Sequence, residues 1–289
     1  MSQLPGTLLD GLIRGLAYVG IALGLTIVFG MLRLVNFAHG AFYMIGAYVG
    51  LVVTEHLGLP LGLIAAPIAV AIFAVILDFA LLRRFYDRNP TAQILITFGI
   101  AIVVQESLRL IFTGTTRSYA IPFWLKSSFN LGFTQYPTYR MIFALGIVVL
   151  IFAVWFFIER TNYGLIVRAG IRDRTMVQLL GGNVRQASTV IFALGGAIAG
   201  LVGAGASPIY NVDPNTGFYF LVPSFVVIVI GGLGSFWGAV AGGLLVGELQ
   251  SLTTLISAPA SDIVIYVAMA IVLMVRPSGL FGESELIRG

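Results

Sequence analysis

The residues best suited to chemistry lie where long apolar segments of this 289-residue chain are interrupted. The first interruption, residues 35–41 (VNFAHGA), places the amide of Asn36 and the imidazole of His39 between two apolar segments. Unsatisfied polar groups are costly inside a membrane, and a helix break there frees backbone groups that need a protein or aqueous partner. The pattern suits a solute-binding site as well as a plain turn between two helices.

A second interruption, residues 231–238 (GGLGSFWG), lies in the other half of the chain. Its four glycines in eight residues are unfavourable for a regular helix. A pair of glycine-broken apolar segments, one in each half, is typical of a transporter site near the middle of the membrane. The residues predicted to line such a path are Asn36, Phe37, His39, Tyr43, Gly234, Ser235 and Trp237.

Few charged residues fall inside the apolar segments, and each has an ordinary structural explanation. Glu106 and Arg109 are three residues apart, so they can pair on one face of a helix. Asp78 lies about one helical turn before two arginines, which places it near the membrane boundary. Glu248 could face a cavity, but one isolated carboxylate does not make a proton relay.

The motifs of several enzyme classes are missing from the sequence. There is no G-x-x-x-x-G-K-[ST], and the only lysine is Lys126, so the chain alone is not expected to hydrolyse ATP. His39 and His56 lack metal-ligand spacing, no cysteine is present, and G-x-S-x-G does not occur. We therefore expect no catalytic residues and no metal site in this chain.

The composition is that of a multi-pass membrane protein. Hydrophobic residues make up 58% of the chain and charged residues only 10%, and the mean hydropathy is +1.00. A soluble fold with this balance would expose too much apolar surface. The net charge of +4 comes from arginines between apolar segments, which the positive-inside rule explains without any nucleic-acid partner.

Nine apolar segments predict an all-α fold in a single transmembrane domain, residues 1–289. Eight crossings would place the N-terminus inside and nine would place it outside, and the sequence does not choose between them. Loops 83–90, 159–188 and 276–289 together carry ten arginines, so that side is predicted to be cytoplasmic. The segments are 11–32, 41–57, 61–82, 92–112, 140–158, 189–206, 220–232, 239–256 and 262–275.

Many of the 35 glycines lie inside these segments, often four residues apart. Gly46 with Gly50 and Gly196 with Gly200 are examples of this spacing. It lets helix backbones approach closely in lipid. Ordinary packing between helices of the same chain is the expected role.

The longest polar interruption is residues 159–188, which hold five arginines against Glu159 and Asp173. Apolar residues recur at helical spacing from Leu165 to Leu180, which predicts one short amphipathic helix. Gly181 and Gly182 are expected to end it, because glycine readily adopts the left-handed conformation of a helix stop. Such a helix can lie on the membrane surface and present one face to a partner.

Several stretches resemble the permease subunits of bacterial branched-chain amino acid ABC importers. LGLTIVFGMLRLVNFAHGAFYMIGAY resembles the family's first signature, and RTNYGLIVRAGIRDRTMVQLLGGNV resembles its cytoplasmic loop. FALGGAIAGLVGA and VIGGLGSFWGAVAGGLLVG resemble the following span and the C-terminal signature. The matches keep the family's order over nearly the whole chain, and they are specific as a set.

The resemblance implies a multi-pass protein of the bacterial inner membrane that pairs with a second, homologous permease subunit. Two cytoplasmic ATPase subunits, which hold the ATP and Mg²⁺, would drive transport, and a periplasmic binding protein would deliver the substrate; this chain itself would carry no cofactor. The amphipathic helix would then couple the permease to the ATPase. The residues assigned to coupling are Gly164, Arg168, Arg172, Asp173, Met176, Leu179 and Gly181.

Other transport functions remain alternatives. Permeases of similar pattern carry urea or short amides, and these motifs do not separate them from amino acid permeases. An aquaporin-like channel would need two Asn-Pro-Ala turns, whereas the one Asn-Pro here, Asn89–Pro90, is followed by Thr91. An ion-coupled transporter would need paired membrane carboxylates, for which only Glu106 and Glu248 qualify.

Overall fold

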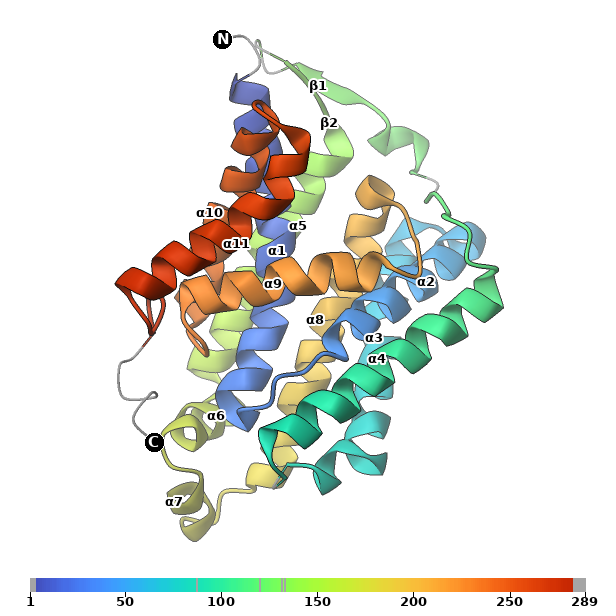
Figure 1. Cartoon of the computed structure of the whole chain (residues 1–289). Coiled ribbons are helices and arrows are strands. Elements are labelled where there is room, and N and C mark those ends of the chain that lie inside the picture. Colours follow the sequence, from blue (N-terminus) through green and yellow to red (C-terminus); the bar gives the residue numbers. More distant parts are fainter. Residues whose placement is uncertain (1–3, 87, 120, 131, 133, 283–289) are drawn as a thin grey trace.

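The computed structural model describes residues 4–86, 88–119, 121–130, 132 and 134–282, although not the side chains of Arg172 and Arg174. Within this part of the chain the fold is all-α apart from one small hairpin, and each of the nine predicted apolar segments is helical (Figure 1). The elements are α1 (Leu4–Leu32), α2 (His39–Leu57), α3 (Leu59–Ala80), η1 (Leu82–Arg84), α4 (Pro90–Phe112), η2 (Phe123–Leu125), β1 (Ser128–Asn130), β2 (Gln135–Pro137), α5 (Thr138–Arg160), α6 (Asn162–Arg172), α7 (Arg174–Leu179), α8 (Val184–Tyr210), α9 (Thr216–Gly231), α10 (Phe236–Thr254) and α11 (Ala258–Val275).

Seven helices among the described residues are long and apolar enough to cross a membrane: α1, α2, α3, α4, α5, α8 and α11. The apolar helix α9 has only 16 residues, and the 19-residue helix α10 lies outside this set. Most of α1 and α8 is buried by neighbouring helices, whereas α3 exposes a stripe of leucine and isoleucine side chains. Such a stripe suits contact with lipid chains.

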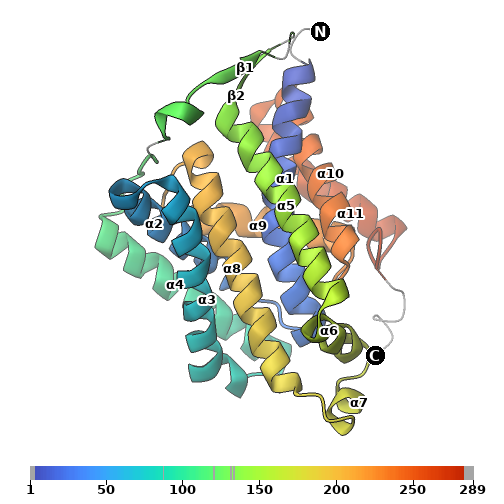
Figure 2. The same cartoon turned by 180° about the vertical axis from the view of Figure 1, so that it is seen from behind.

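Helix α8 packs between α3 and α5 in the middle of the bundle (Figure 2). Its contact with α2 depends on glycine, because a Cβ at Gly46 would lie only 2.3 Å from the Cα of Gly200. In the same way, Gly247 of α10 faces Gly15 of α1. Close packing of glycines within one chain, predicted from their spacing, is therefore confirmed.

Polar side chains define where several helices begin. The side chain of Asn89 accepts a hydrogen bond from the backbone N–H of Ala92, and Pro90 follows at the first helical position of α4. Ser235 caps α10 in the same manner through the N–H of Gly238. These caps satisfy backbone N–H groups that would otherwise be unpaired in the first turns of α4 and α10.

The two ends of the bundle differ in structure (Figure 1). The N-terminal end of α1 and the β1–β2 hairpin lie at one end, here called the outer end, and α6 and α7 lie at the opposite, inner end. The hairpin pairs Ser128 with Pro137 and Asn130 with Gln135, antiparallel. It was not predicted from the sequence, since residues 113–139 carry no clear alternation of apolar and polar residues.

Candidate functional site

Three of the predicted path residues lie inside the protein. Asn36 is 1% exposed, and its side-chain oxygen accepts a hydrogen bond from the N–H of Ala38 at 3.1 Å. His39 begins α2 with no exposed surface, and its Nε2 lies 3.2 Å from the backbone oxygen of Ile21. Tyr43 is equally buried and stacks on Phe220 at a centroid distance of 4.9 Å.

Each of these three side chains keeps an unsatisfied polar atom. Asn36 Nδ2, His39 Nδ1 and the Tyr43 hydroxyl have no hydrogen-bond partner among the described residues. Buried polar atoms are usually paired, so these three mark a polar region within the apolar bundle. Because all three side chains are buried, they do not themselves line an exposed surface of this chain.

Phe37 connects the first interruption to the second half of the chain. Its ring lies 5.0 Å from that of Phe225 in α9 and 6.0 Å from that of Phe98 in α4. The contact with Phe225 matters because α9 runs directly into the second interruption. Phe37 of the first broken segment therefore packs against the helix that leads into the second, which lies about 200 residues away in sequence.

The second interruption is the turn between α9 and α10. Gly234 adopts a φ of +82°, which favours glycine, and it approaches Gly30 in the last turns of α1. Ser235 is committed to capping α10, whereas Trp237 is 50% exposed. Of the predicted path residues in this turn, Trp237 is the one with a large exposed side chain.

The amphipathic stretch is two helices, so the prediction of one continuous helix is wrong. The chain bends at Asp173, whose extended backbone ends α6 and whose side chain accepts a hydrogen bond from the N–H of Met176 at 2.8 Å to begin α7. An aspartate in this position competes with helix continuation. The stop is as predicted, because Gly181 has a φ of +82° just after α7.

The helix α6 is fixed to the bundle. Arg168 donates to the backbone oxygen of Ile158 at 2.7 Å and pairs with Glu159 at 2.5 Å. Gly164 is needed because a Cβ there would meet the backbone oxygen of Ile158 at 2.1 Å. At its other end, the side chain of Ile171 lies against Gly30 of α1.

The helix α7 instead presents bare apolar side chains. Met176 is 52% exposed, Leu179 is 78% exposed and Leu180 is 81% exposed. The side chain of Arg172 lies outside the described residues. An exposed apolar cluster at the tip of a polar loop is typical of a docking surface.

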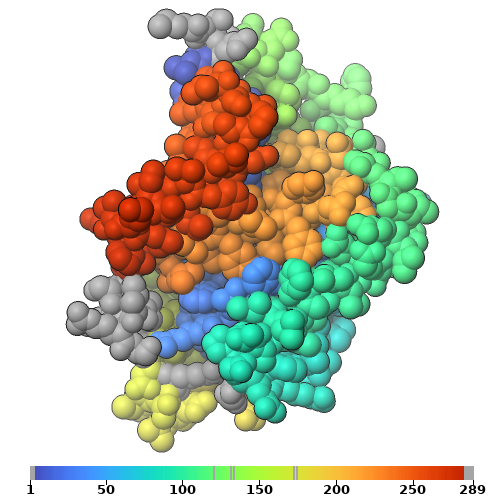
Figure 3. Space-filling view, viewed as in Figure 1, coloured from blue at the N-terminus to red at the C-terminus, as the bar shows by residue number. Residues whose placement is uncertain are grey.

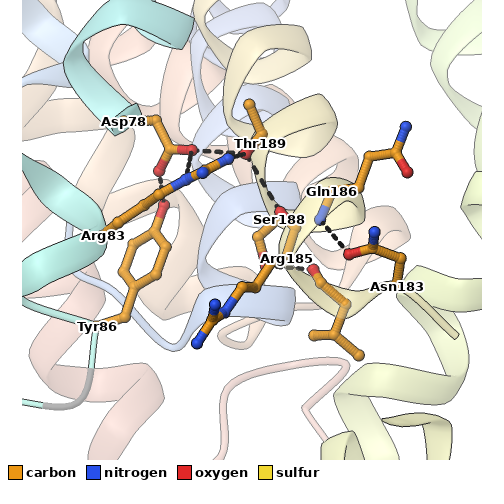
Figure 4. Close-up of polar contacts among 9 residues, drawn as sticks. Asp78, Arg83, Tyr86, Asn183, Arg185, Gln186, Ser188 and Thr189 are labelled. Atoms are coloured by element: carbon orange, nitrogen blue, oxygen red, sulfur yellow. Dashed lines mark hydrogen bonds and ion pairs between the residues drawn. The ribbon is translucent and has the colours of Figure 1, made fainter. Parts of the chain in front are cut away.

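A buried polar cluster lies where the loop after α3 meets the start of α8 (Figure 4). The sequence predicted only that Asp78 lies near the membrane boundary. Asp78, expected at the membrane boundary, is fully buried and pairs with Arg83 at 3.1 Å. Thr189 donates to Asp78 at 2.6 Å and accepts from Arg83 at 2.7 Å, and the Tyr86 hydroxyl also bonds Asp78. The cluster ties the loop after α3 to the first turns of α8, directly after the coupling stretch.

The other predicted charges differ in their exposure. Glu106 and Arg109 pair at 2.8 Å as expected, with both side chains almost half exposed. The Oε2 atom of Glu248 is buried beside Gly11 with no hydrogen-bond partner in the described part of the chain. Neither group has the second carboxylate that an ion-coupled transporter would need.

A cavity of about 460 Å³ opens on the face where α9 lies between α11 and α4 (Figure 3). Its polar lining includes Gln105, Asn215, Gln250 and Asp262, and its apolar lining includes Val222 and Ile265. None of these residues was among the predicted path residues. The signal that would have found two of them is a polar residue, Gln250 or Asp262, inside an apolar helix.

Comparison with known proteins agrees with this arrangement. Residues 7–273 match a family described as the permease component of branched-chain amino acid transport systems. The chain is 30% identical to the high-affinity branched-chain amino acid permease protein BraD of Pseudomonas aeruginosa, over 96% of both chains. It is 28% identical to LivH of Salmonella typhimurium and 27% identical to LivH of Escherichia coli, in each case over 96% of this chain and 95% of the relative. The chain therefore belongs to the family of permease components of branched-chain amino acid transport systems.

Proposed function

We propose that this chain forms part of the translocation pathway of an ATP-driven importer of branched-chain amino acids in the bacterial inner membrane. Family membership over residues 7–273 is the observation that carries the proposal. The chain is a transport component and not an enzyme; the ATP and Mg²⁺ belong to two ATPase subunits at the inner end. A second permease subunit and a periplasmic binding protein complete the transporter.

The topology that fits this role has nine crossings and an external N-terminus. Helix α1 starts at the outer end, opposite α6 and α7 (Figure 1). The arginine-rich loops 83–90 and 159–188 then face the cytoplasm, in agreement with the positive-inside rule. The short helix α9 and the helix α10 supply the two crossings that length and hydropathy leave open.

The helix α7 is the coupling element, with Met176 and Leu179 entering an apolar groove of the ATPase. Buried apolar anchors contribute most of the affinity of such contacts, and charges at the rim contribute little. From α7, displacement passes to α6 and then through Ile171 to Gly30, next to Gly234 of the second interruption. In this way movement of the ATPase reaches the broken segments.

The two interruptions border the pathway. Phe37 and Trp237 contribute partly exposed rings to the path. Asn36, His39 and Tyr43 are buried and support the residues that line it. Gly234 and Ser235 set the turn between α9 and α10. A path of this composition is mostly neutral, which suits a zwitterion with an apolar side chain.

The test replaces both Met176 and Leu179 with Asp, which would bury two unpaired charges in the docking contact. We expect the ATPase to be lost during co-purification and ATP-dependent leucine uptake to fall to background, with the permease pair still assembled. The matched control replaces Phe123 and Trp124 with Asp, because both side chains are exposed in the loop at the outer end. Full ATPase recovery and normal uptake with the Met176 and Leu179 variant would refute α7 as the coupling element.

A further inference from the structure

The segment that follows α11, residues 276–282 and here called the clasp, folds back onto the end of α9 (Figure 1). The N–H of Leu280 donates to the backbone oxygen of Ile230 at 2.8 Å, and the N–H of Phe281 donates to that of Gly231 at 2.9 Å. Both oxygens belong to the last turn of α9, where a helix leaves its carbonyl groups without intrahelical partners. Because Ile230 and Gly231 are buried, the clasp supplies hydrogen bonds that these carbonyls need.

The clasp and the end of α9 also touch backbone to backbone. Gly279 is buried with a φ of +81°, and a Cβ there would lie 2.6 Å from the Cα of Gly232 and 2.8 Å from the backbone oxygen of Val229. Gly232 in turn has a φ of +105°, and a Cβ there would lie 2.5 Å from the nitrogen of Gly282. Glycine is required on both sides, so no side chain separates the clasp from the first residue after α9.

The body of α11 does not hold this contact in place. Its buried residues in the described structure are Ser261 and Ile265, both in its first half, and residues 266–275 include none. Leu280 of the clasp, by contrast, packs against the hydrophobic core of the bundle. The chain therefore returns to the bundle at the clasp, after a helical half that is largely unsupported.

The clasp holds the second interruption at a point close to the coupling loop. Gly232 begins the turn between α9 and α10, and two residues later a Cβ at Gly234 would lie 3.5 Å from the Cα of Gly30 in α1. A Cβ at Gly30 would lie 3.3 Å from Cδ1 of Ile171 in α6. The turn thus has two supports, the clasp at Gly232 and α1 at Gly234, and the second support adjoins α6.

We propose that the clasp is a positioning segment that fixes the turn between α9 and α10, so that movement of the coupling loop displaces the pathway. Without the clasp, the carbonyl groups of Ile230 and Gly231 lose their donors and the end of α9 loosens. A push through Ile171 would then be absorbed by a loose turn. The inference rests on the proposed import function, and it makes the clasp a determinant of how much leucine enters per ATP hydrolysed.

The test introduces Gly279→Ala into the full transporter, with its ATPases and binding protein in proteoliposomes. The added Cβ strains a positive φ and collides with Gly232, which displaces the clasp. We expect L-leucine uptake to fall about tenfold, the scale set by two lost backbone hydrogen bonds. ATP hydrolysis stimulated by the binding protein should persist, so uptake per ATP falls as well.

Hydrogen–deuterium exchange of the same assembled transporter separates positioning from simple padding. The amides of Leu280 and Phe281 should exchange slowly in the native protein and fast in Gly279→Ala. Peptides that cover residues 232–238 should also exchange faster, while those of α8 stay unchanged and show that the fold is intact. A segment that only covers the surface would release its own amides without loosening the turn.

The matched control is Gly132→Ala in the turn of the β1–β2 hairpin. Its φ of +83° is close to that of Gly279, but a Cβ there would meet no atom within 4 Å. The control therefore imposes the same backbone strain without a collision, and both uptake and exchange at the turn should match those of the native protein. If Gly279→Ala does not assemble, Phe281→Pro serves instead, because it removes only the hydrogen bond to Gly231 at a half-exposed side chain.

Normal uptake per ATP in a variant whose clasp amides exchange fast would overturn the inference. Unchanged exchange at residues 232–238 after release of the clasp would overturn it too. If the unaltered transporter takes up no leucine, the import function fails, but the exchange experiment still shows whether the clasp holds the turn.

Discussion

Asp78 and Asp262 are both aspartates in terminal turns of apolar helices, yet their surroundings are opposite. Asp78, at the end of α3, is fully buried and bonded to Arg83, Tyr86 and Thr189 (Figure 4). Asp262, near the start of α11, is exposed in a cavity without a cationic partner among the described residues. The difference separates a charge that holds the protein together from a charge that is available to a ligand.

The largest expected effect on stability comes from breaking the buried cluster around Asp78. Asp78→Ala leaves Arg83 without its carboxylate and removes the acceptor of the Thr189 hydroxyl. We expect the free energy of unfolding to fall by about 3–5 kcal/mol, as when one partner of a buried ion pair is removed. Thermal unfolding of the detergent-purified protein measures this, and a transition temperature equal to that of the native protein would show that the cluster is not structural.

Arg83→Lys should have a smaller effect. The guanidinium bonds Asp78 through Nε and Thr189 through a terminal nitrogen, and a lysine ammonium cannot reproduce both directions. The expected loss is about 1 kcal/mol, the worth of one hydrogen bond. Arg84→Lys is the matched control, because Arg84 forms no ion pair with any carboxylate in the described residues. Equal shifts in the two variants would contradict the assigned geometry.

The smallest effect on stability is expected at Arg14 and Asp262, two charged residues without an ion pair in the described structure. Asp262→Asn keeps the size of the side chain nearly unchanged, Arg14→Gln shortens it, and neither variant breaks an ion pair of the described structure. Their transition temperatures should therefore lie close to that of the native protein. A marked loss of stability in either variant would mean that its charge supports the fold, as the charge of Asp78 does.

The sequence by itself determined the fold class and the positions of the helices. Membrane helices must be long, apolar and internally hydrogen-bonded, so composition alone identifies them. The nine predicted segments differ from the observed helices by up to seven residues at their ends, the largest difference being the start of α1 at Leu4 and not at residue 11. Caps such as Asn89 and Ser235 decide where some of the helices start. The stop at Gly181 was equally local, since it depends on one residue able to adopt a positive φ.

The bend at Asp173 also depends on a local interaction. It was not predicted, because the apolar residues keep a helical spacing on both sides of it. The apolar residues from Leu165 to Leu180 keep a helical spacing through the bend, although Asp173 ends one helix and caps the next. Periodicity reports which residues share a face and says little about a single break. The side-chain hydrogen bond to the N–H of Met176 decides the break.

Only the tertiary structure decided which polar residues are buried and which line a cavity. Asn36, His39 and Tyr43 have the residue types of a binding site, but α1, α8 and α9 bury them. Arg14 and Asp262 are about 250 residues apart in sequence and come to adjacent cavities because α10 packs against both α1 and α11. A local pattern predicted the pairing of Glu106 with Arg109, whereas burial arises from contacts between distant segments that no local pattern records.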